Sequence, residues 1–342
     1  MHDRRAKRMG CGRKSVVPMV RRLILACLLA MLPAARAAAA DALLRIGVLK
    51  FGTVSWVMDV ISHHRLDAAE GLSIEPTEYA SNPATLVALQ AGRVDCVVSD
   101  WLWVSRQRAA GADWAFFPFS TAVGALIEAP SGTIHGLADL RQRRLGVAGS
   151  PLDKSWIILR ALARRQSGID LERETRASFA APPLLEQEFL AGRLDAVLTF
   201  WQFAARLESR GAKPVLSVSD ALRALGFESA VPLVGYVVSE RWADSHADRL
   251  SAFVRAVRAA NSLLATSDAE WEWLEPRTGA RDAADLEALR DAFRAGIPLR
   301  WGDAERRDAE RLYAVFAQIG GETLVGQSPD LQPGTFLDTV RY

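Results

Sequence analysis

The feature that most restricts the fold is an internal repeat with an offset of 100 residues. The stretch "AGRVDCVVSDWLW" at 91–103 returns as "AGRLDAVLTFWQF" at 191–203, with Ala, Gly, Arg, Asp, Val and Trp at matching places. Upstream of each copy, a short apolar run leads through a loop into the pair Ser-Trp, at Ser55-Trp56 and again at Ser155-Trp156. A duplicated order of segments predicts two similar structural units, each built around a core of its own.

Strands and helices are predicted to alternate within each copy. Runs rich in β-branched residues precede helical patterns that begin beside a proline, and we expect Asn82 to be the N-cap of the first of these helices. Gly92 and Gly192 end two of the helices, as residues that tolerate positive φ. Alternation of this kind predicts an α/β fold with parallel strands and right-handed crossovers. From Arg241 on, apolar residues recur at helical spacing, and we expect these helices to pack back on the first unit.

The first forty residues are predicted to be an export signal. A basic leader is followed by the apolar run Leu23–Leu32 and by small residues, which is typical of a Sec-type signal peptide cut between Ala37 and Ala40. Residues 1–40 hold nine of the 42 Lys and Arg residues and one of the 40 Asp and Glu residues, so 33 basic and 39 acidic residues remain and the net charge becomes −6. This charge argues against a nucleic-acid partner.

Cysteine and histidine usage predicts no metal site and no disulfide. Cys96 is alone after removal of the leader, and its apolar surroundings predict a buried residue. His63 and His64 are adjacent and lie on different faces of a predicted helix, without a Cys or another His at ligand spacing. The pattern of a phosphate loop or a nucleophile elbow is also missing. We therefore predict no metal, no cofactor and no catalytic residue.

Four stretches carry a resemblance to a known family: 88–95 ("ALQAGRVD"), 135–150, 189–197 ("FLAGRLDAV") and 237–256. In this order they resemble the periplasmic solute-binding proteins of ABC importers, and most of all the group with aliphatic sulfonate, nitrate/taurine and thiamine-pyrimidine binders. The resemblance covers nearly all of the chain after the leader. It implies a two-lobed periplasmic-binding-protein fold (type II-like), in which each lobe is a mainly parallel sheet flanked by helices.

The resemblance also implies how the chain is divided. Lobe 1 is expected to comprise residues 41–124 and 235–342, including the C-terminal helices, and lobe 2 residues 125–234. Thr121–Pro130 and Val231–Glu240 are the expected crossing strands between them. Two lobes of this kind close over a ligand.

The implied function is that of an exported receptor. It would capture a small polar or heteroaromatic solute, of sulfonate, aminopyrimidine or amine type, and deliver it to an inner-membrane permease with its ATPase. The resemblance implies a periplasmic monomer that is not an enzyme. Two alternatives stay open: a small-molecule enzyme on the same fold (pyrimidine-synthase-like or a lyase), and a periplasmic ligand sensor that acts in trans.

The repeated residues are predicted to be scaffold, with the ligand site at the opposite ends of the strands. Asp95 and Asp195 begin strands, and their carboxylates are expected to accept hydrogen bonds from local backbone N–H groups. Ligands of open α/β sheets bind at the carboxyl ends of the strands. The residues predicted there to bind ligand are Lys50, Phe51, Gly52, Thr53, Ser55, Trp56, Ser81, Asn82, Ser99, Asp100, Trp101, Trp103, Ser150, Lys154, Ser155, Trp156, Thr199, Phe200 and Trp201.

The tryptophans among these residues suit a flat heterocycle or a cation. Trp56, Trp156 and Trp201 fit a core position equally well, and we expect only one of Trp101 and Trp103 to face the cleft because they are spaced i, i+2.

The polar candidates leave the charge of the ligand open. Ser55 and Ser155 begin helices whose N–H groups could bind an anion, or they could be ordinary N-caps. Lys50 and Lys154 are two of the three lysines after the leader and could neutralise an anion or lie in solvent. Asp100 could pair with a ligand amine or cap the helix that follows.

Overall fold

The computed structural model describes residues 42–50 and 52–342. The predicted export signal, residues 1–40, and the predicted site residue Phe51 lie outside the described residues. Residues Leu44–Tyr342 form one compact unit.

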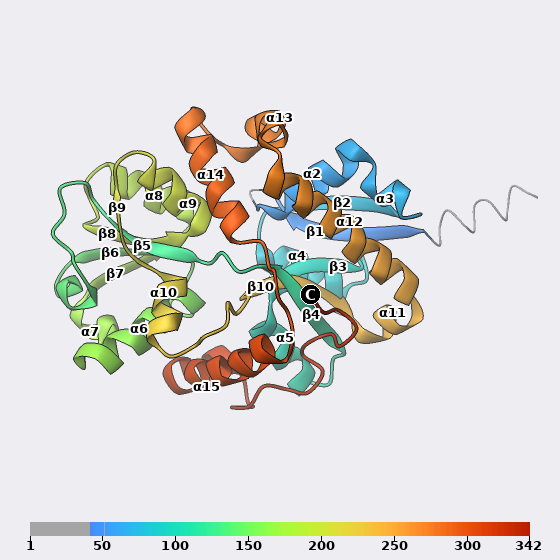
Figure 1. Ribbon diagram of the computed structural model, residues 1–342. Helices are drawn as coiled ribbons and strands as arrows, with labels where there is room; N and C mark the ends of the chain where they lie inside the picture. The colour runs from blue at the N-terminus through green and yellow to red at the C-terminus, as the bar shows by residue number, and fades with distance from the viewer. Residues whose placement is uncertain (1–41, 51) are drawn as a thin grey trace, which may run out of the picture. The chain divides into compact units, whose positions relative to one another are not determined.

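This unit contains two mixed sheets of five strands each, flanked by helices (Figure 1). The first sheet has the order β2 (Ser73–Tyr79), β1 (Leu43–Leu49), β3 (Cys96–Asp100), β10 (Val234–Ser239) and β4 (Trp114–Ser120). The second has the order β7 (Arg176–Ala180), β6 (Arg144–Ala148), β8 (Ala196–Phe200), β5 (Gly124–Glu128) and β9 (Lys213–Ser217). The predicted α/β class is confirmed, and the two sheets follow one plan, as the repeat indicated.

Each sheet departs from the predicted parallel arrangement at one strand. β1 pairs with β3 and β6 pairs with β8 in parallel, but β10 and β5 are antiparallel to both of their neighbours. These are the strands that follow a connection from the other sheet, so the chain enters them from the opposite direction. The predicted crossing strands each lie mainly in one sheet, and only Thr121–Val123 and the residues before Val234 make the connections.

The helices account for most of the remaining described residues. They are α2 (Val54–His64), α3 (Leu66–Ala69), α4 (Asn82–Gln90), α5 (Trp101–Ala109), the 3₁₀ turn η1 (Leu137–Leu140), α6 (Lys154–Ser167), α7 (Leu171–Glu174), α8 (Pro182–Leu190), α9 (Trp201–Glu208), α10 (Val218–Ala224), α11 (Glu240–Ser245), α12 (Ala247–Thr266), α13 (Asp268–Thr278), α14 (Ala283–Ala295) and α15 (Asp303–Val325). Ser81, one residue before the predicted Asn82, is the N-cap of α4 and accepts a hydrogen bond from the Ala84 N–H. Gly92 (φ +65°) and Gly192 (φ +72°) have the positive φ expected after a helix.

The repeated aspartates hold neighbouring strands together at their amino ends. The Asp95 carboxylate accepts hydrogen bonds from the Arg45 backbone N–H (2.9 Å) and from its guanidinium Nε (3.0 Å). In the second copy, Asp195 accepts from the backbone N–H (2.8 Å) and the Nε (3.2 Å) of Arg144. These N–H groups belong to the adjacent strand and not to the local backbone that we expected. The repeated part is therefore scaffold, and each aspartate joins two strands.

The C-terminal helices contact both halves of the molecule, which differs from the prediction that they pack back on the first unit. α12 and α13 pack against α2, but α14 packs against α9, and α15 packs against both α5 and α6 (Figure 1). The proposed division into lobes of residues 41–124 with 235–342 and of residues 125–234 stays a prediction.

Cys96 lies at the start of β3 and is fully buried. Burial raises the pKa of its thiol far above the ordinary value, so the thiol stays protonated. Within residues 42–50 and 52–342, no helix is long and apolar enough to span a membrane.

Candidate ligand-binding site

Two adjoining cavities lie at the carboxyl ends of the strands, and both have Gly52 and Gln202 in their walls. The first, which we call the inner pocket, has a volume of about 200 Å³. It is lined by Leu49, Gly52, Thr53, Val54, Val98, Phe119, Ser120, Ala122, Val123, Asp153, Lys154, Ser155, Phe200, Trp201, Gln202, Leu233 and Val234. Its wall is mainly apolar and comes from both sheets and from both connections between them.

The second cavity, which we call the arginine pocket, has a volume of about 240 Å³. It is lined by Lys50, Gly52, Ser55, Trp56, Pro183, Glu186, Gln202, Phe203, Arg206, Arg277, Thr278, Gly279 and Arg281. Its wall is polar and contains four basic side chains. Together the two pockets offer an apolar chamber and a charged one to a single small molecule.

About half of the predicted site residues line these pockets. They are Lys50, Gly52, Thr53, Ser55, Trp56, Lys154, Ser155, Phe200 and Trp201. The residues that line neither pocket are Ser81, Asn82, Ser99, Asp100, Trp101, Trp103, Ser150, Trp156 and Thr199.

Three of the predicted tryptophans belong to the core. Trp101 is fully buried, and its Nε1–H donates to the Pro232 carbonyl at 2.8 Å. Trp156 is fully buried against Phe179, and Trp103 packs on Trp114. Because α5 and α6 turn these side chains toward the packed interior, neither member of the Trp101 and Trp103 pair faces a pocket.

Trp56 and Trp201 form the wall between the two pockets. Their rings meet edge to face with centroids 5.9 Å apart, and both contact Phe293 of α14. Trp201 is half-buried and lines the inner pocket, whereas Trp56 lines the arginine pocket and donates from Nε1 to the Arg277 carbonyl at 3.3 Å. An indole face at this position suits the apolar part of a ligand.

Strand alternation explains why two predicted hydroxyls lie outside the inner pocket. Val98 and Phe200 line it, so Ser99 and Thr199, the neighbouring residues, point to the other face of their sheets. Both are buried, and within the described residues their hydroxyls have no hydrogen-bond partner.

The remaining polar candidates outside the pockets have local structural roles. The Ser150 hydroxyl accepts from the Leu152 N–H at 3.2 Å. Asn82 donates from its side-chain amide to the Val98 carbonyl at 3.3 Å. Ser81 is exposed and caps α4.

Asp100 and Lys154 are each other's partners, and Asp100 also caps α5, which was one of its two predicted alternatives. The Lys154 Nζ lies 2.9 Å from Asp100 Oδ2, and Asp100 Oδ1 accepts from the Trp103 N–H at 2.8 Å. Burial alone would raise the pKa of Asp100, but the Lys154 ammonium and the Trp103 N–H hold that pKa below its ordinary value. For Lys154, burial works in the opposite direction, and the nearby Asp100 and Asp153 carboxylates raise its pKa. The ion pair joins the end of β3 in one sheet to the helix that follows β6 in the other.

The N–H groups at the amino ends of α2 and α6 are less accessible to an anion than the sequence indicated. Asp153 caps α6 by accepting from the N–H groups of Ser155 (2.9 Å) and Trp156 (3.4 Å). At α2 the Ser55 hydroxyl donates to the Gly52 carbonyl at 2.6 Å, and the N-cap Thr53 makes no side-chain capping bond.

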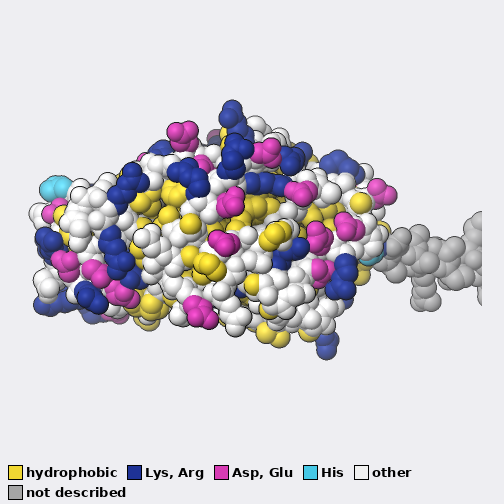
Figure 2. Space-filling model, turned by 90° about the horizontal axis from the view of Figure 1, so that it is seen from below, with side chains coloured by type: hydrophobic (Ala, Val, Ile, Leu, Met, Phe, Trp, Pro, Cys, Tyr) yellow, Lys and Arg dark blue, Asp and Glu magenta, His cyan; other side chains and the backbone are white. Residues whose placement is uncertain are grey.

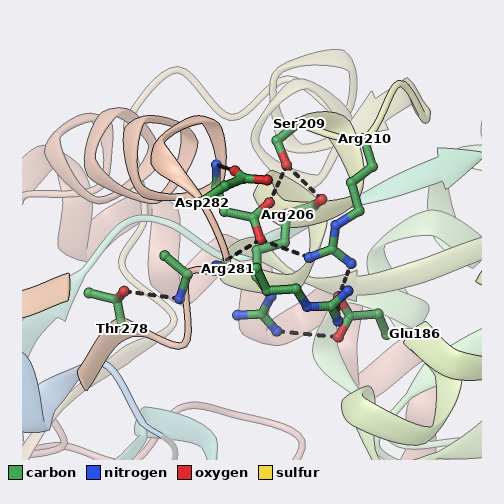
Figure 3. Close-up of polar contacts among 9 residues, drawn as sticks. Glu186, Arg206, Ser209, Arg210, Thr278, Arg281 and Asp282 are labelled. Carbon is green, nitrogen blue, oxygen red and sulfur yellow. Dashed lines mark hydrogen bonds and ion pairs between the residues drawn. The ribbon is translucent and has the colours of Figure 1, made fainter. Parts of the chain in front are cut away.

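Arginines that sequence reasoning missed surround one carboxylate. Glu186, on α8, lies 3.4 Å from Arg206, 3.2 Å from Arg210 and 3.9 Å from Arg281, as the dashed lines in Figure 3 indicate. Arg210 also pairs with Asp285 at 2.8 Å, and Asp285 accepts from the Ser209 hydroxyl. Arg206 lies in the last turn of α9, and Arg210 follows two residues after the helix ends, so their i, i+4 spacing was a sequence signal for two neighbouring side chains. The approach of Arg281 depends on the packing of α14 on α9, for which the sequence holds no signal.

Away from the pockets, the surface carries both basic and acidic side chains. On the face shown in Figure 2, basic and acidic side chains are interspersed. Among the described residues, no group of three or more His, Cys, Asp or Glu side chains is arranged to hold a metal ion.

Comparison with known proteins identifies the family of this chain. The model of the family described as "NMT1/THI5 like" matches residues 68–268, which is more than half of the chain. The chain belongs to the NMT1/THI5-like family. No curated protein matches this NMT1/THI5-like chain.

Solved structures match most of this NMT1/THI5-like protein. The alkanesulfonate-binding protein SsuA from Xanthomonas axonopodis pv. citri, bound to MOPS, is 18% identical with a TM-score of 0.66, and the match covers 86% of this chain and 98% of that one. The periplasmic aliphatic sulphonate binding protein SsuA from Escherichia coli is also 18% identical, with a TM-score of 0.67 and coverage of 87% and 94%. A ligand-binding component of an ABC-type import system from Staphylococcus aureus, with zinc bound, is 12% identical, with a TM-score of 0.62 and coverage of 88% and 99%. The predicted resemblance and the periplasmic-binding-protein fold are thereby confirmed.

Proposed function

We propose that this NMT1/THI5-like protein is the exported substrate-binding component of an ABC import system. The observation that carries the proposal is the inner pocket, whose wall is assembled from the carboxyl ends of strands in both sheets. Two structural relatives support it: the ligand-binding component of an ABC-type import system and the periplasmic aliphatic sulphonate binding protein. We propose further that the leader in residues 1–40 directs the chain to the periplasm, and that it acts there as a monomer.

Capture of the solute would depend on its burial in the inner pocket and not on a chemical reaction. Val98, Phe119 and Trp201 offer an apolar surface in a pocket of about 200 Å³. The Asp100–Lys154 ion pair, at 2.9 Å, holds the two sides of the pocket together. A solute enclosed in this way would then be delivered to a membrane permease that works with an ATPase.

The test is native mass spectrometry of residues 41–342 purified from the periplasm without refolding. We expect a bound small molecule that is lost on denaturation. Val123→Trp fills the inner pocket, because Val123 lies in its wall, and should abolish retention of the solute. Val87→Trp is the matched control, since Val87 is 64% exposed on α4 and lines neither pocket.

Retention of the solute by a folded Val123→Trp protein would contradict the proposed site. A retained molecule that the protein converts to a product would instead support the alternative of an enzyme on the same fold. A bare mass for the unmodified protein, together with no thermal stabilisation by a panel of organic acids, amines and pyrimidines, would contradict the binding function.

A further inference from the structure

The arginine pocket carries more positive than negative charge. Lys50, Arg206, Arg277 and Arg281 line it, and among the described residues in its wall Glu186 is the one carboxylate. Arg277 has a partner outside the wall, because its guanidinium lies 2.8 Å from Asp59. Arg206 and Arg281 share Glu186 with a third guanidinium, that of Arg210.

Glu186 is unusual for a glutamate because its side chain is only 9% exposed. A buried carboxylate needs hydrogen bonds and opposite charges, and this one receives both from guanidinium groups. Within the described residues, Glu186 is the one carboxylate paired with Arg206 or Arg281, so a single negative charge faces two guanidinium groups. Asp285 compensates Arg210, at 2.8 Å, and therefore does not neutralise the other two.

We propose that the arginine pocket is an anion-binding subsite in which the Glu186 carboxylate occupies the place of the acid group of a bound solute. This inference rests on the proposed function, since it concerns the same ligand. The two pockets share Gly52 and Gln202, so one molecule can place its apolar part in the inner pocket and its acid group among the arginines. Carboxylates, sulfonates and phosphates match the planar donor fork of arginine.

The inner pocket itself offers no competing position for an acid group. Its Lys154 ammonium is neutralised by Asp100 at 2.9 Å. The first N–H groups of α6 are occupied by the Asp153 carboxylate. An acid group placed there would also meet the Asp153 carboxylate in the wall, so the orientation with the acid group toward Arg206 and Arg281 is favoured.

The experiment uses four probes with the same hexyl chain: hexanoate, hexanesulfonate, 1-hexanol and hexylammonium. Binding to residues 41–342 is followed by isothermal titration and by tryptophan fluorescence, because Trp56 and Trp201 line the two pockets. We expect the two anions to bind at least about tenfold more tightly than the alcohol and the amine. Arg281→Gln should weaken binding of the anions about tenfold, and Arg206→Gln provides a second test with the less exposed arginine.

Glu186→Gln distinguishes two roles of Glu186. In one it is a placeholder, which occupies the position of the acid group of the solute, and in the other it only stabilises the fold. If Glu186 competes with the acid group, removal of its charge should tighten anion binding about three- to tenfold and leave 1-hexanol unchanged. Glu188→Gln is the matched control on the same helix, because Glu188 pairs with Arg193 and lines neither pocket.

Two outcomes overturn the inference separately from the function. Equal binding of all four probes, with no effect of the arginine variants, would refute the subsite and leave the import function standing. Unchanged or weaker anion binding by a folded Glu186→Gln protein would refute the placeholder role. If no hexyl compound binds and no solute is retained on purification, both the inference and the proposed function fail.

Discussion

The two copies of the repeat agree at the amino ends of their strands and differ at the carboxyl ends. At the amino ends, Asp95 and Asp195 accept the same pair of hydrogen bonds from Arg45 and Arg144. At the carboxyl ends, Asp100 has Phe200 as its counterpart, and a core tryptophan is matched by one that lines a pocket. A duplicated unit keeps the residues that hold its sheet together, and it can change those that meet a ligand without losing its fold.

The comparison is tested most strongly by Trp101 and Trp201, which occupy matching positions. Trp101→Ala removes a fully buried side chain and should lower the free energy of unfolding by about 3–5 kcal/mol. Trp201→Ala should cost clearly less, because Trp201 is only half-buried, but it should weaken solute binding. Urea denaturation with parallel binding titrations measures both effects. Equal losses of stability would contradict the assignment of one tryptophan to the core and the other to the site.

The second test concerns the amino ends. Asp95→Ala leaves the Arg45 N–H without its acceptor and should cost about 1–3 kcal/mol of stability, measured by urea denaturation. Asp195→Ala should lower stability less, because the ion pair of Asp195 with Arg144 is more exposed. The side chains of Asp195 and Arg144 are 27% and 48% exposed, whereas those of Asp95 and Arg45 are 15% and 40% exposed. Neither substitution should change solute affinity under conditions where the protein is folded. A loss of affinity would mean that these aspartates do more than join strands.

Much of the fold could be predicted because the repeat displays its element order twice. The alternation of strands and helices and the glycines after the helices are local patterns, and the repetition of the two aspartates indicated their scaffold role, although their donors lie on an adjacent strand. The antiparallel strands β5 and β10 could not be read in the same way, because their direction depends on the route of the chain between sheets.

The sequence predicted where the candidate site lies, at the carboxyl ends of the strands, but it predicted only part of the residues that line the pockets. The ends of β1, β3 and β8 and the start of α6 do contribute to the pockets, but the pairing of Asp100 with Lys154 spans two sheets. Trp101 was indistinguishable from Trp201 in sequence because both open a helix after a strand. Glu186 and Arg281 come together only through the packing of helices far apart in the chain.

The third test concerns the ion pair that joins the two copies. A double-mutant cycle with Asp100→Asn and Lys154→Met should give a coupling of about 1 kcal/mol in stability, since the pair is partly exposed. The pKa of Asp100 is lowered from 3.8, so this stabilisation should be lost as the pH falls through the lowered value. The pKa of Lys154 is raised from 10.5, so the stabilisation should also be lost as the pH rises through that raised value. Between pH 5 and 9, roughly, the coupling should be constant.

Thermal unfolding of the four proteins across this pH range provides the measurement. A coupling energy that changes near pH 6 or 7 would show that another group titrates beside the pair. It would contradict the prediction that Asp100 and Lys154 alone determine the pH dependence.

The smallest effect is expected at a polar residue outside the pockets. Ser81→Ala removes the N-cap of α4 and should lower stability by about 0.5–1 kcal/mol. Solute affinity should stay the same, because the exposed Ser81 lines neither pocket. Calorimetric titration of the variant with the retained solute checks this, and Ser81→Asp, which preserves a cap, is the control. Weaker binding by the alanine variant alone would extend the site to the start of α4.

The burial of Cys96 offers a direct test of the proposed lobe movement. It is the one cysteine in residues 41–342, and its thiol is protonated and inaccessible, so alkylating dyes have nothing to attack on the folded surface. Cysteines introduced at the exposed positions Val87 on α4 and Leu184 on α8 would therefore take up a donor and an acceptor fluorophore, one in each copy of the repeat. Energy transfer between them would follow opening and closing in single molecules, with no native residue to be replaced first.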